Sequence, residues 1–224
     1  NNAIYRFLLE ESDDNSATFE GDVEFIMLNQ LNVDSSSTFT GLSTVSDSIT
    51  IIVHEDMTDE DSPRINYLDL GADGVQTQIA DQVAAPSHSG TVTFDSANYK
   101  TADTVVVTLD DQDLNTDSEL LDVYIVEQDD KVGNQGSDHV LDITFNDVLW
   151  QSGEDAVSAT YAGSPDDGLE RSGFTLVETA IDSGIFVGSF QVPSTYYDSG
   201  SATTVTTTGT DIEVNYNDHR DASG

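Results

Sequence analysis

The sequence predicts an all-β protein built from antiparallel β-sandwich modules, with little helix. Short runs of alternating apolar and polar residues are the main observation, and each run has the length of one half-buried strand. Clusters of Gly, Asp, Asn and Ser between the runs are typical of turns. No window shows a convincing 3.6-residue apolar period, so helix should be minor. The runs are Val92 to Phe94, Thr104 to Leu109, Leu121 to Val126, Val140 to Phe145, Phe186 to Val192 and Asp211 to Tyr216.

The chain is strongly acidic. It has 224 residues and a formal net charge of -37, from 43 Asp and Glu against 6 Lys and Arg. High charge with few hydrophobic residues is typical of disordered chains, but Phe, Tyr, Val and Ile are plentiful here and are gathered in the strand-like runs. Because such a charge opposes folding, we expect salt to screen it or bound cations to neutralise it. Nucleic acid and anionic membrane surfaces are not expected as partners.

Several chemistries have no residues to support them. The chain has no Cys, so disulfides, thiolate metal sites and a cysteine nucleophile are excluded. There is no run of eighteen apolar residues and no basic-then-apolar leader, so no direct membrane insertion of this segment is expected. The chain starts at Asn1 without Met, and we expect it to be an excised or processed portion of a longer protein.

Two segments of the chain repeat each other. FLLEESDDNSATFEGDVEF, from Phe7, aligns without a gap with FTLVETAIDSGIFVGSFQV, from Phe174, at an offset of 167 residues. Further downstream HEDMTDED and YNDHRDAS match at an offset of 162. Both copies are therefore predicted to form strand, turn, strand, variable loop, strand and an acidic D-x-x-D ending. The matched residues of the first segment include Phe7 with Phe174, Leu9 with Leu176, Glu11 with Glu178, Ser16 with Ser183, Phe19 with Phe186 and Gly21 with Gly188.

The repeat predicts the domain organisation. Residues 90–224 form one complete β-sandwich module, and residues 1–70 form the closing part of another. Residues 71–89, with Ala, Gln, Ser, Gly and a Pro, are predicted as a linker or short crossover. A partial sandwich exposes strand edges and an apolar face, which are not stable alone. The first part is therefore expected either to pack onto the second module or to be completed by residues outside this chain.

The densest acidic loop follows the run that ends at Leu109. Oxygen-bearing side chains at alternate positions, with further carboxylates behind them, are the ligands that a hard cation such as Ca²⁺ prefers. Thr116 stands where an EF-hand has its Gly, and no flanking helices are expected, so an EF-hand is excluded but a Ca²⁺-binding interstrand loop is not. A solvated acidic turn is the alternative. The candidate ligands are Asp111, Asp113, Asn115, Asp117 and Asp122.

The two D-x-x-D endings are a second group of candidate ligands. They consist of Asp56 with Asp59 and of Asp218 with Asp221. Carboxylates at the end of one β-module and the start of the next can share a cation, which would stiffen the joint between modules. A charged loop that keeps the surface soluble is the alternative reading.

The sequence does not predict an enzyme. The four His residues are scattered, and neither H-E-x-x-H nor G-x-S-x-G occurs. A glycosidase needs two carboxylates at a defined separation, and among 43 acidic residues a pair in the sequence carries little information. Exposed aromatics around Trp150 or the pair Tyr196 and Tyr197 would instead indicate a sugar- or protein-binding surface, although aromatics in strands are more often core.

The chain resembles the tandem β-sandwich modules of archaeal surface-layer proteins, particularly those of ammonia-oxidising archaea. The resemblance lies in GTVTFDSANYKTADTVVVTLDDQDLNTDS from Gly90, FTLVETAIDSGIFVGSFQV from Phe174 and IEVNYNDHRDASG from Ile212, and more weakly in residues 7–59. The first copy departs from the pattern, with Ser16, Ala17 and Thr18 where the hairpin carries Gly before its aromatic residue. The resemblance implies immunoglobulin-like modules of antiparallel Greek-key type.

The resemblance also implies a function. A surface-layer (S-layer) protein is secreted and self-assembles into a porous lattice at the cell surface, with divalent cations such as Ca²⁺ supporting assembly. Copies of the chain and adjacent modules of a longer chain would be its partners, and its acidic pores would enrich cations such as ammonium. A cell-surface adhesive or carbohydrate- or protein-binding β-sandwich is the alternative, and simple halophilic adaptation is a further one.

Overall fold

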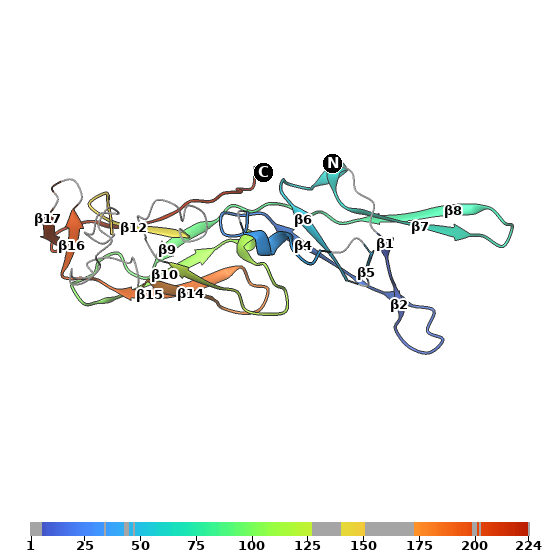
Figure 1. Cartoon of the computed structure of the whole chain (residues 1–224), viewed down its shortest axis with the longest axis horizontal. Coiled ribbons are helices and arrows are strands. Elements are labelled where there is room, and N and C mark those ends of the chain that lie inside the picture. Colours follow the sequence, from blue (N-terminus) through green and yellow to red (C-terminus); the bar gives the residue numbers. More distant parts are fainter. Residues whose placement is uncertain are drawn as a thin grey trace. The chain divides into compact units, whose positions relative to one another are not determined.

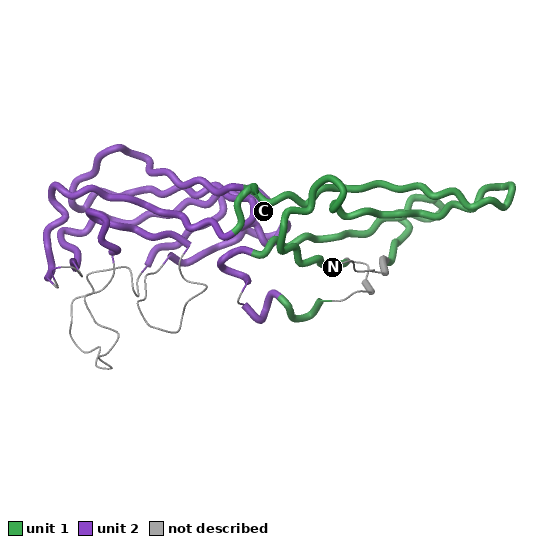
Figure 2. Tube along the Cα trace, turned by 90° about the horizontal axis from the view of Figure 1, so that it is seen from above, with its two compact units in different colours: residues 1–28, 39–88, 220–224 green, residues 29–38, 89–219 purple. Residues whose placement is uncertain are grey.

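A computed structural model describes residues 6–33, 35–42, 45–46, 48–126, 140–150, 173–198, 201 and 203–223. The chain forms two compact units (Figure 2). Unit 1 contains residues 1–28, 39–88 and 220–224, and unit 2 contains residues 29–38 and 89–219. Unit 2 thus begins next to the predicted module start at residue 90, but it also takes in residues 29–38 and leaves residues 220–224 to unit 1.

The described part of unit 2 contains two larger antiparallel sheets and one two-stranded sheet (Figure 1). One has the strand order β11, β14, β15, β10, β9, the other has the order β13, β12, β18, and β16 pairs with β17 in a separate hairpin. All six predicted runs are strands of this unit. The bounds are β9 (Thr91–Phe94), β10 (Thr104–Asp110), β11 (Val123–Val126), β12 (Leu141–Phe145), β13 (Val148–Leu149), β14 (Phe174–Glu178), β15 (Ile185–Gln191), β16 (Thr195–Asp198), β17 (Thr203–Thr206) and β18 (Ile212–Tyr216).

One hydrophobic core joins the two sheets of unit 2. Alternate residues of β10 are buried, as the period-2 pattern predicts, and so are alternate residues of β12, β14 and β15. The buried residues of β10 share a cluster with those of β12 in the other sheet. The two sheets thus bury apolar faces together, as in a β-sandwich. The fully buried members include Val105, Val107, Leu109, Leu141, Ile143, Phe145, Leu176 and Phe186.

Unit 1 contains only two-stranded sheets in its described part. Strands β2 and β3 pair antiparallel, as do β7 and β8, whereas β1 with β5 and β4 with β6 are parallel. The prediction of purely antiparallel pairing is therefore wrong here, because residues 28–47 are long enough to cross over between parallel strands. The bounds are β1 (Arg6–Phe7), β2 (Glu10–Glu11), β3 (Phe19–Glu20), β4 (Asp22–Met27), β5 (Val45–Ser46), β6 (Ser48–Val53), β7 (Arg64–Leu70) and β8 (Gln76–Gln82).

Within residues 71–89, which the sequence predicts as a linker or short crossover, residues 76–82 form the strand β8. This strand pairs with β7 from Arg64 opposite Gln82 to Leu70 opposite Gln76. Asp73 and Gly74 make the turn, in which Gly74 has a φ of 76° and the Val75 N–H donates to Asp73 Oδ1 at 3.0 Å. An Asp-Gly turn between two strands is a hairpin signal, which the Gln-rich composition of β8 obscured.

Helix is confined to short 3₁₀ turns in the described residues. These are η1 (Ser36–Phe39), η2 (Asp59–Asp61) and η3 (Gln112–Leu114). None of the helices described is long or apolar enough to cross a bilayer. The prediction of an all-β chain with little helix is confirmed.

The first repeated segment forms the same hairpin in both units. In β2–β3, Glu11 lies opposite Phe19, and in β14–β15, Glu178 lies opposite Phe186, which preserves the offset of 167 residues. Glu11 Oε1 accepts the Ala17 N–H at 2.9 Å, and Glu178 Oε1 accepts the Gly184 N–H at 2.9 Å. The two turns also share a hydroxyl contact of 3.2 Å, between Ser12 and Ser16 in one and Thr179 and Ser183 in the other.

Ala17 keeps the turn of the first copy although it replaces a glycine. Its φ is 56°, and that of the matching Gly184 is 61°. The left-handed conformation costs an Ala roughly 1–2 kcal/mol because of its Cβ. The departure of the first copy from the sequence pattern therefore changes the strain in the turn and leaves its geometry unchanged.

Candidate functional site

The predicted acidic loop begins at the end of β10, and its first two carboxylates are buried. Asp111 is 2 % exposed and Asp113 is 4 % exposed. Asp111 precedes η3, and its Oδ1 accepts the Asp113 N–H at 2.9 Å, as an N-cap residue does. The local chain therefore brings two carboxylates inside unit 2, where an unpaired charge is costly.

Residues distant in the sequence complete the surroundings of this pair. The Tyr216 hydroxyl donates to Asp111 Oδ2, and Gln30 Nε2 donates to the Tyr216 hydroxyl at 3.0 Å. Asn29 Nδ2 donates to the Asp113 carbonyl at 2.7 Å. These contacts explain why residues 29–38 belong to unit 2 rather than to the sequence neighbours that precede them.

The electrostatics of the pair favour neutralisation of Asp111. Burial raises the pKa of Asp111 to about 6, against the hydrogen bonds from the Tyr216 hydroxyl and the Asp113 N–H. The charges of Asp218 and Asp113 add to the rise of this pKa. Asp218 Oδ2 accepts the Gly90 N–H at 2.9 Å. Three of the nine predicted ligands thus interact at one place in unit 2, and a cation there would offset their mutual repulsion.

The rest of the acidic loop binds its own backbone. Asp122 accepts the Thr116 N–H at 2.7 Å, the Thr116 hydroxyl at 2.8 Å and the Asp117 N–H at 3.2 Å. Asp117 Oδ1 accepts the N–H groups of Glu119 and Leu120 at 2.9 and 3.0 Å. These two carboxylates therefore order the loop as turn acceptors, and they do not converge with Asp111.

Asn115 faces a different element. Its Nδ2 donates to Asp182 Oδ1, in the turn between β14 and β15, at 2.6 Å. Its Oδ1 is buried and has no hydrogen-bond partner within the described part of the chain. The amide thus fastens the acidic loop to the neighbouring turn and leaves one oxygen ligand unused.

Glu178 is an important carboxylate that the candidate ligands did not include. Its Oε1 accepts the Ser183 N–H at 2.7 Å and the Gly184 N–H at 2.9 Å, and its Oε2 accepts the Asp122 N–H at 3.2 Å. Burial alone would raise the pKa of Glu178, but these backbone donors together lower it below the ordinary value. The match of Glu178 with Glu11 in the repeat was the sequence signal for this role.

The D-x-x-D endings are divided between the units. In unit 1, Asp56 Oδ1 accepts the Ser87 N–H at 3.2 Å, and the Ser87 hydroxyl donates to the Asp221 carbonyl at 2.8 Å. The side chain of Asp221 accepts the Ser223 N–H at 2.8 Å, and the hydrogen bonds from Ser223 lower the pKa of Asp221. Asp218 lies in unit 2 with Gly90. Ser87 therefore links the two endings through Asp56 and Asp221.

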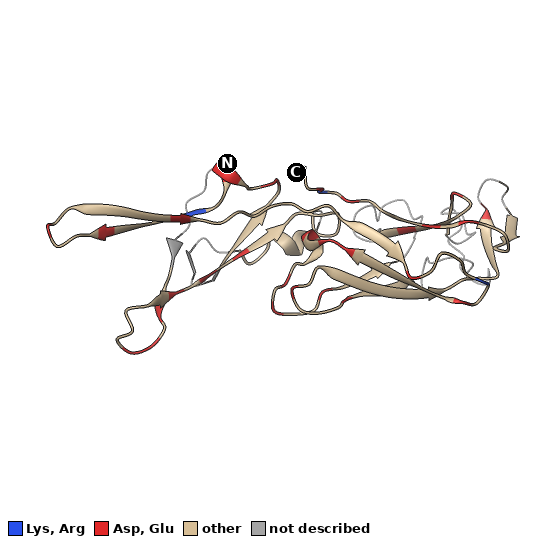
Figure 3. Ribbon diagram, turned by 180° about the vertical axis from the view of Figure 1, so that it is seen from behind, with Lys and Arg blue, Asp and Glu red and all other residues tan. Residues whose placement is uncertain are grey.

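Acidic side chains occur throughout both units, and basic ones are few (Figure 3). In unit 1 an open depression is lined by Asp56, Asp59, Glu60 and Asp61, together with Arg64. Asp59 starts η2 with a φ of 48°. Two further predicted ligands, Asp56 and Asp59, thus share one depression of unit 1.

The nine predicted ligands do not form a single metal centre. Over the described residues, no three His, Asp or Glu side chains form a group that could hold a metal ion. The carboxylates of Asp111, Asp113 and Asp218 nevertheless have the hard oxygen chemistry that suits Ca²⁺. A cation would have to draw these three carboxylates together.

The aromatic residues considered as a binding surface are mostly core. Trp150 and Tyr196 are buried, and both contact Phe145, with ring centroids 5.6 and 5.3 Å away. Trp150 also lies 5.4 Å from the ring of Phe190. Tyr197 is half-buried. The cluster therefore stabilises the core of unit 2 and presents no stacking platform for a sugar.

No protein-family model matches the chain, and no curated protein matches it. The site must therefore be interpreted from its own geometry. Tyr216 and Asn29 could not be assigned to it from the sequence, because each lies far along the chain from the carboxylate loop and neither belongs to a spaced motif.

Proposed function

We propose that this chain is a structural module of an acidic, cation-binding extracellular surface layer that assembles from copies of itself. The observation that carries the proposal is the β7–β8 hairpin of unit 1. Its two strands form a sheet of their own, so both outer edges lack a neighbouring strand among the described residues. A two-stranded sheet with such edges is marginal in water and is a template for pairing with another chain.

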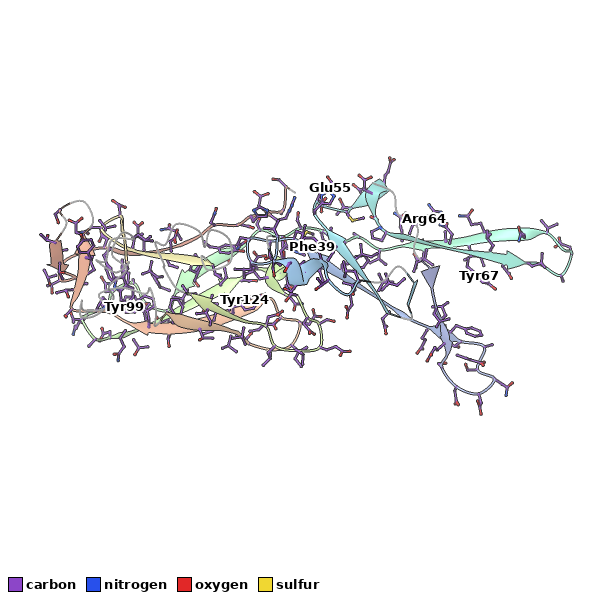
Figure 4. The ribbon with its side chains drawn as sticks, in the orientation of Figure 1. Phe39, Glu55, Arg64, Tyr67, Tyr99 and Tyr124 are labelled. Carbon is purple, nitrogen blue, oxygen red and sulfur yellow. The ribbon has the colours of Figure 1, made fainter. Side chains whose placement is uncertain are left out.

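The hairpin exposes large apolar side chains on both faces. Tyr67 (Figure 4) and Ile79 lie opposite each other and are exposed, and on the other face Leu68 and Leu70 are exposed as well. Exposed apolar surface of this extent marks an interaction site. Exposure of this apolar surface to water would be unfavourable for a monomer.

The charge of the hairpin favours a second copy as the partner. Strands β7 and β8 carry one Arg against two Asp, a net charge of -1 over their two seven-residue spans, in a chain of net charge -37. Two equally acidic molecules repel each other least where they meet through weakly charged surfaces. In an antiparallel pairing of two β8 strands centred on Ile79, Asp81 would face Thr77 of the second copy, so no like charges would oppose each other.

Cations would support the same assembly. Asp111, Asp113 and Asp218 are the residues that would hold a Ca²⁺ ion in unit 2, where it would neutralise carboxylates that now repel one another. The remaining exposed carboxylates would line the pores of the layer, attracting cations such as ammonium and repelling anions. The buried aromatic cluster weighs against the adhesive or carbohydrate-binding alternative.

Sedimentation velocity tests the assembly proposal. In moderate salt with Ca²⁺, the wild-type chain should form species larger than the 24.1 kDa monomer. The double variant Tyr67→Asp and Leu70→Asp adds charge to exposed positions that do not lie opposite each other, and it should remain monomeric without loss of folding. Leu120→Asp, at an exposed position of unit 2, is the matched control and should assemble as the wild type does. Equal assembly by the double variant would refute the role of the hairpin.

A further inference from the structure

The β2–β3 hairpin has a buried counterpart in the same molecule. Leu9 is 46 % exposed, while its repeat partner Leu176 is 0 % exposed. Phe19 is 57 % exposed, while its partner Phe186 is 0 % exposed. Because the turn contacts and strand register are the same in the two hairpins, the difference lies in what covers them.

One continuous segment, residues 104–126, flanks the hairpin of unit 2 on both edges, while strand β12 of the second sheet shares the core that buries its apolar face. Its first strand, β10, places Leu109 opposite Phe186, and its second strand, β11, places Tyr124 opposite Leu176. The ring centroids of Tyr124 and Phe186 are 5.3 Å apart. The segment therefore supplies a strand on each outer edge of β14–β15 and an aromatic side chain on its apolar face.

The same segment also forms hydrogen bonds with Glu178, the glutamate of the β14–β15 turn. Asp122, the residue before β11, donates its N–H to Glu178 Oε2 at 3.2 Å, and its carbonyl accepts the Glu178 N–H at 3.0 Å. The matching Glu11 uses Oε1 for its own turn, and no described residue donates to its Oε2. Glu11 thus presents an acceptor at the position where unit 2 receives its covering segment.

We infer that the β2–β3 hairpin is a docking site for a strand–acidic loop–strand segment with the chemistry of residues 104–126. The incoming segment would pair with the outer edge of β2, donate an N–H to Glu11 and lay an aromatic ring on Phe19. The inference rests on the exposed face and on its covered repeat, and it does not depend on the proposed surface-layer function.

The affinity of the proposed interaction should depend on salt concentration in a way that distinguishes it from pairing through opposite charges. The hairpin carries five acidic residues, and the segment that covers its counterpart is also acidic. Screening should therefore strengthen the pairing, since apolar and backbone contacts supply the attraction and the charges oppose it. An interaction held by complementary charges would weaken with salt. The five residues of the hairpin are Glu10, Glu11, Asp13, Asp14 and Glu20.

The test uses the full ¹⁵N-labelled chain and a synthetic peptide of residues 102–126. Amide signals of residues 8–20 should shift in a saturable one-to-one titration, and their hydrogen exchange should slow, more so in 1 M than in 0.1 M NaCl. Phe19→Asp and Leu9→Asp should each weaken binding at least tenfold. Both residues are already exposed, so folding is not at risk. Leu42→Asp, at another exposed position of unit 1, should bind the peptide as the wild type does.

Three results would overturn the inference. The first is no shift of residues 8–20 at millimolar peptide. The second is a shift confined to unit 2, which would mean that the peptide only displaces its own strands. The third is protection of residues 8–20 that rises with protein concentration in the absence of peptide, which would make a second copy the occupant. Failure of assembly in the sedimentation experiment would leave this inference intact.

Discussion

Asp111 is the residue whose protonation most clearly affects stability, and it is one of the three carboxylates at which we propose that a cation binds. Its pKa is raised to about 6 from an ordinary 3.8, so the folded chain binds this proton more tightly than the unfolded chain does. The contribution of protonated Asp111 to the free energy of unfolding is therefore fully present below pH 4 and is lost as the pH rises through 6. Without a cation, the ionised carboxylate destabilises unit 2 at neutral pH.

Asp111→Asn removes this ionisation. In EDTA, the variant should be more stable than the wild type above pH 6 by roughly 2 kcal/mol after allowance for solvent screening, and the difference should vanish near pH 4. Urea unfolding across this pH range measures it. Ca²⁺ at neutral pH should stabilise the wild type and not the variant. A difference that stays constant with pH would contradict the assigned role of Asp111.

Glu178 should show the opposite dependence on pH. Its lowered pKa means that its contribution to stability is present above the ordinary value of 4.5 and is lost as the pH falls through the folded pKa. Glu178→Gln keeps the shape of the side chain but weakens the bonds from Ser183 and Gly184. We expect a loss of about 1–2 kcal/mol at pH 7 that shrinks in acid. An undiminished loss at pH 3 would show that packing, rather than charge, is responsible.

Among the elements, the two repeated hairpins allow a matched comparison. Gly184→Ala forces a side chain into a left-handed position and brings its Cβ to 2.9 Å from Gln112 Cα, so we expect a loss of roughly 2 kcal/mol. Ala17→Gly relieves the same strain, for a local gain of ~0.5 kcal/mol once the entropy of Gly is included. Hydrogen exchange of the Thr179 and Ser12 amides reports on each turn. The same sign of effect in both would be inconsistent with one shared turn.

The elements also show what the sequence could predict. The strands of unit 2 could be predicted because apolar and polar residues alternate along a half-buried strand of an antiparallel sheet. Strands β10 and β12 show this alternation in their burial. β8 was missed because its exposed faces carry Gln, Thr and Asp and show no alternation, leaving only the Asp-Gly turn as a signal. The parallel pairing of β4 with β6 has no local signal at all, since it depends on a long crossover.

The acidic loop of the candidate site could be predicted from the sequence, but the residues that contact it from distant parts of the chain could not. The spacing of the acidic loop pointed to Asp111 and Asp113, and the structure buries both. The same spacing included Asp117, which instead caps its own turn, because a short Asp side chain competes equally well for nearby backbone donors. Tyr216 and Asn29 reach the site only through tertiary structure, which spacing does not encode.

For the whole molecule, the net charge sets the salt and cation conditions under which it can fold, and under which the proposed assembly could form. A net charge of -37 must be compensated by counterions whether the chain is alone or packed against others. Bringing copies together concentrates this charge further, so divalent cations should affect assembly more strongly than they affect the fold of either unit. In the proposed assembly, the exposed apolar strands would provide the attraction, and cations would reduce the repulsion that opposes it.

The cation dependence of self-assembly can be measured by sedimentation velocity of the wild-type chain during a Ca²⁺ titration at constant ionic strength. We expect a shift from a 24.1 kDa monomer to larger species as Ca²⁺ rises, with reversal by EDTA. A matched increase in Na⁺ should produce a smaller shift. An identical monomer distribution in Ca²⁺ and in EDTA would contradict the account.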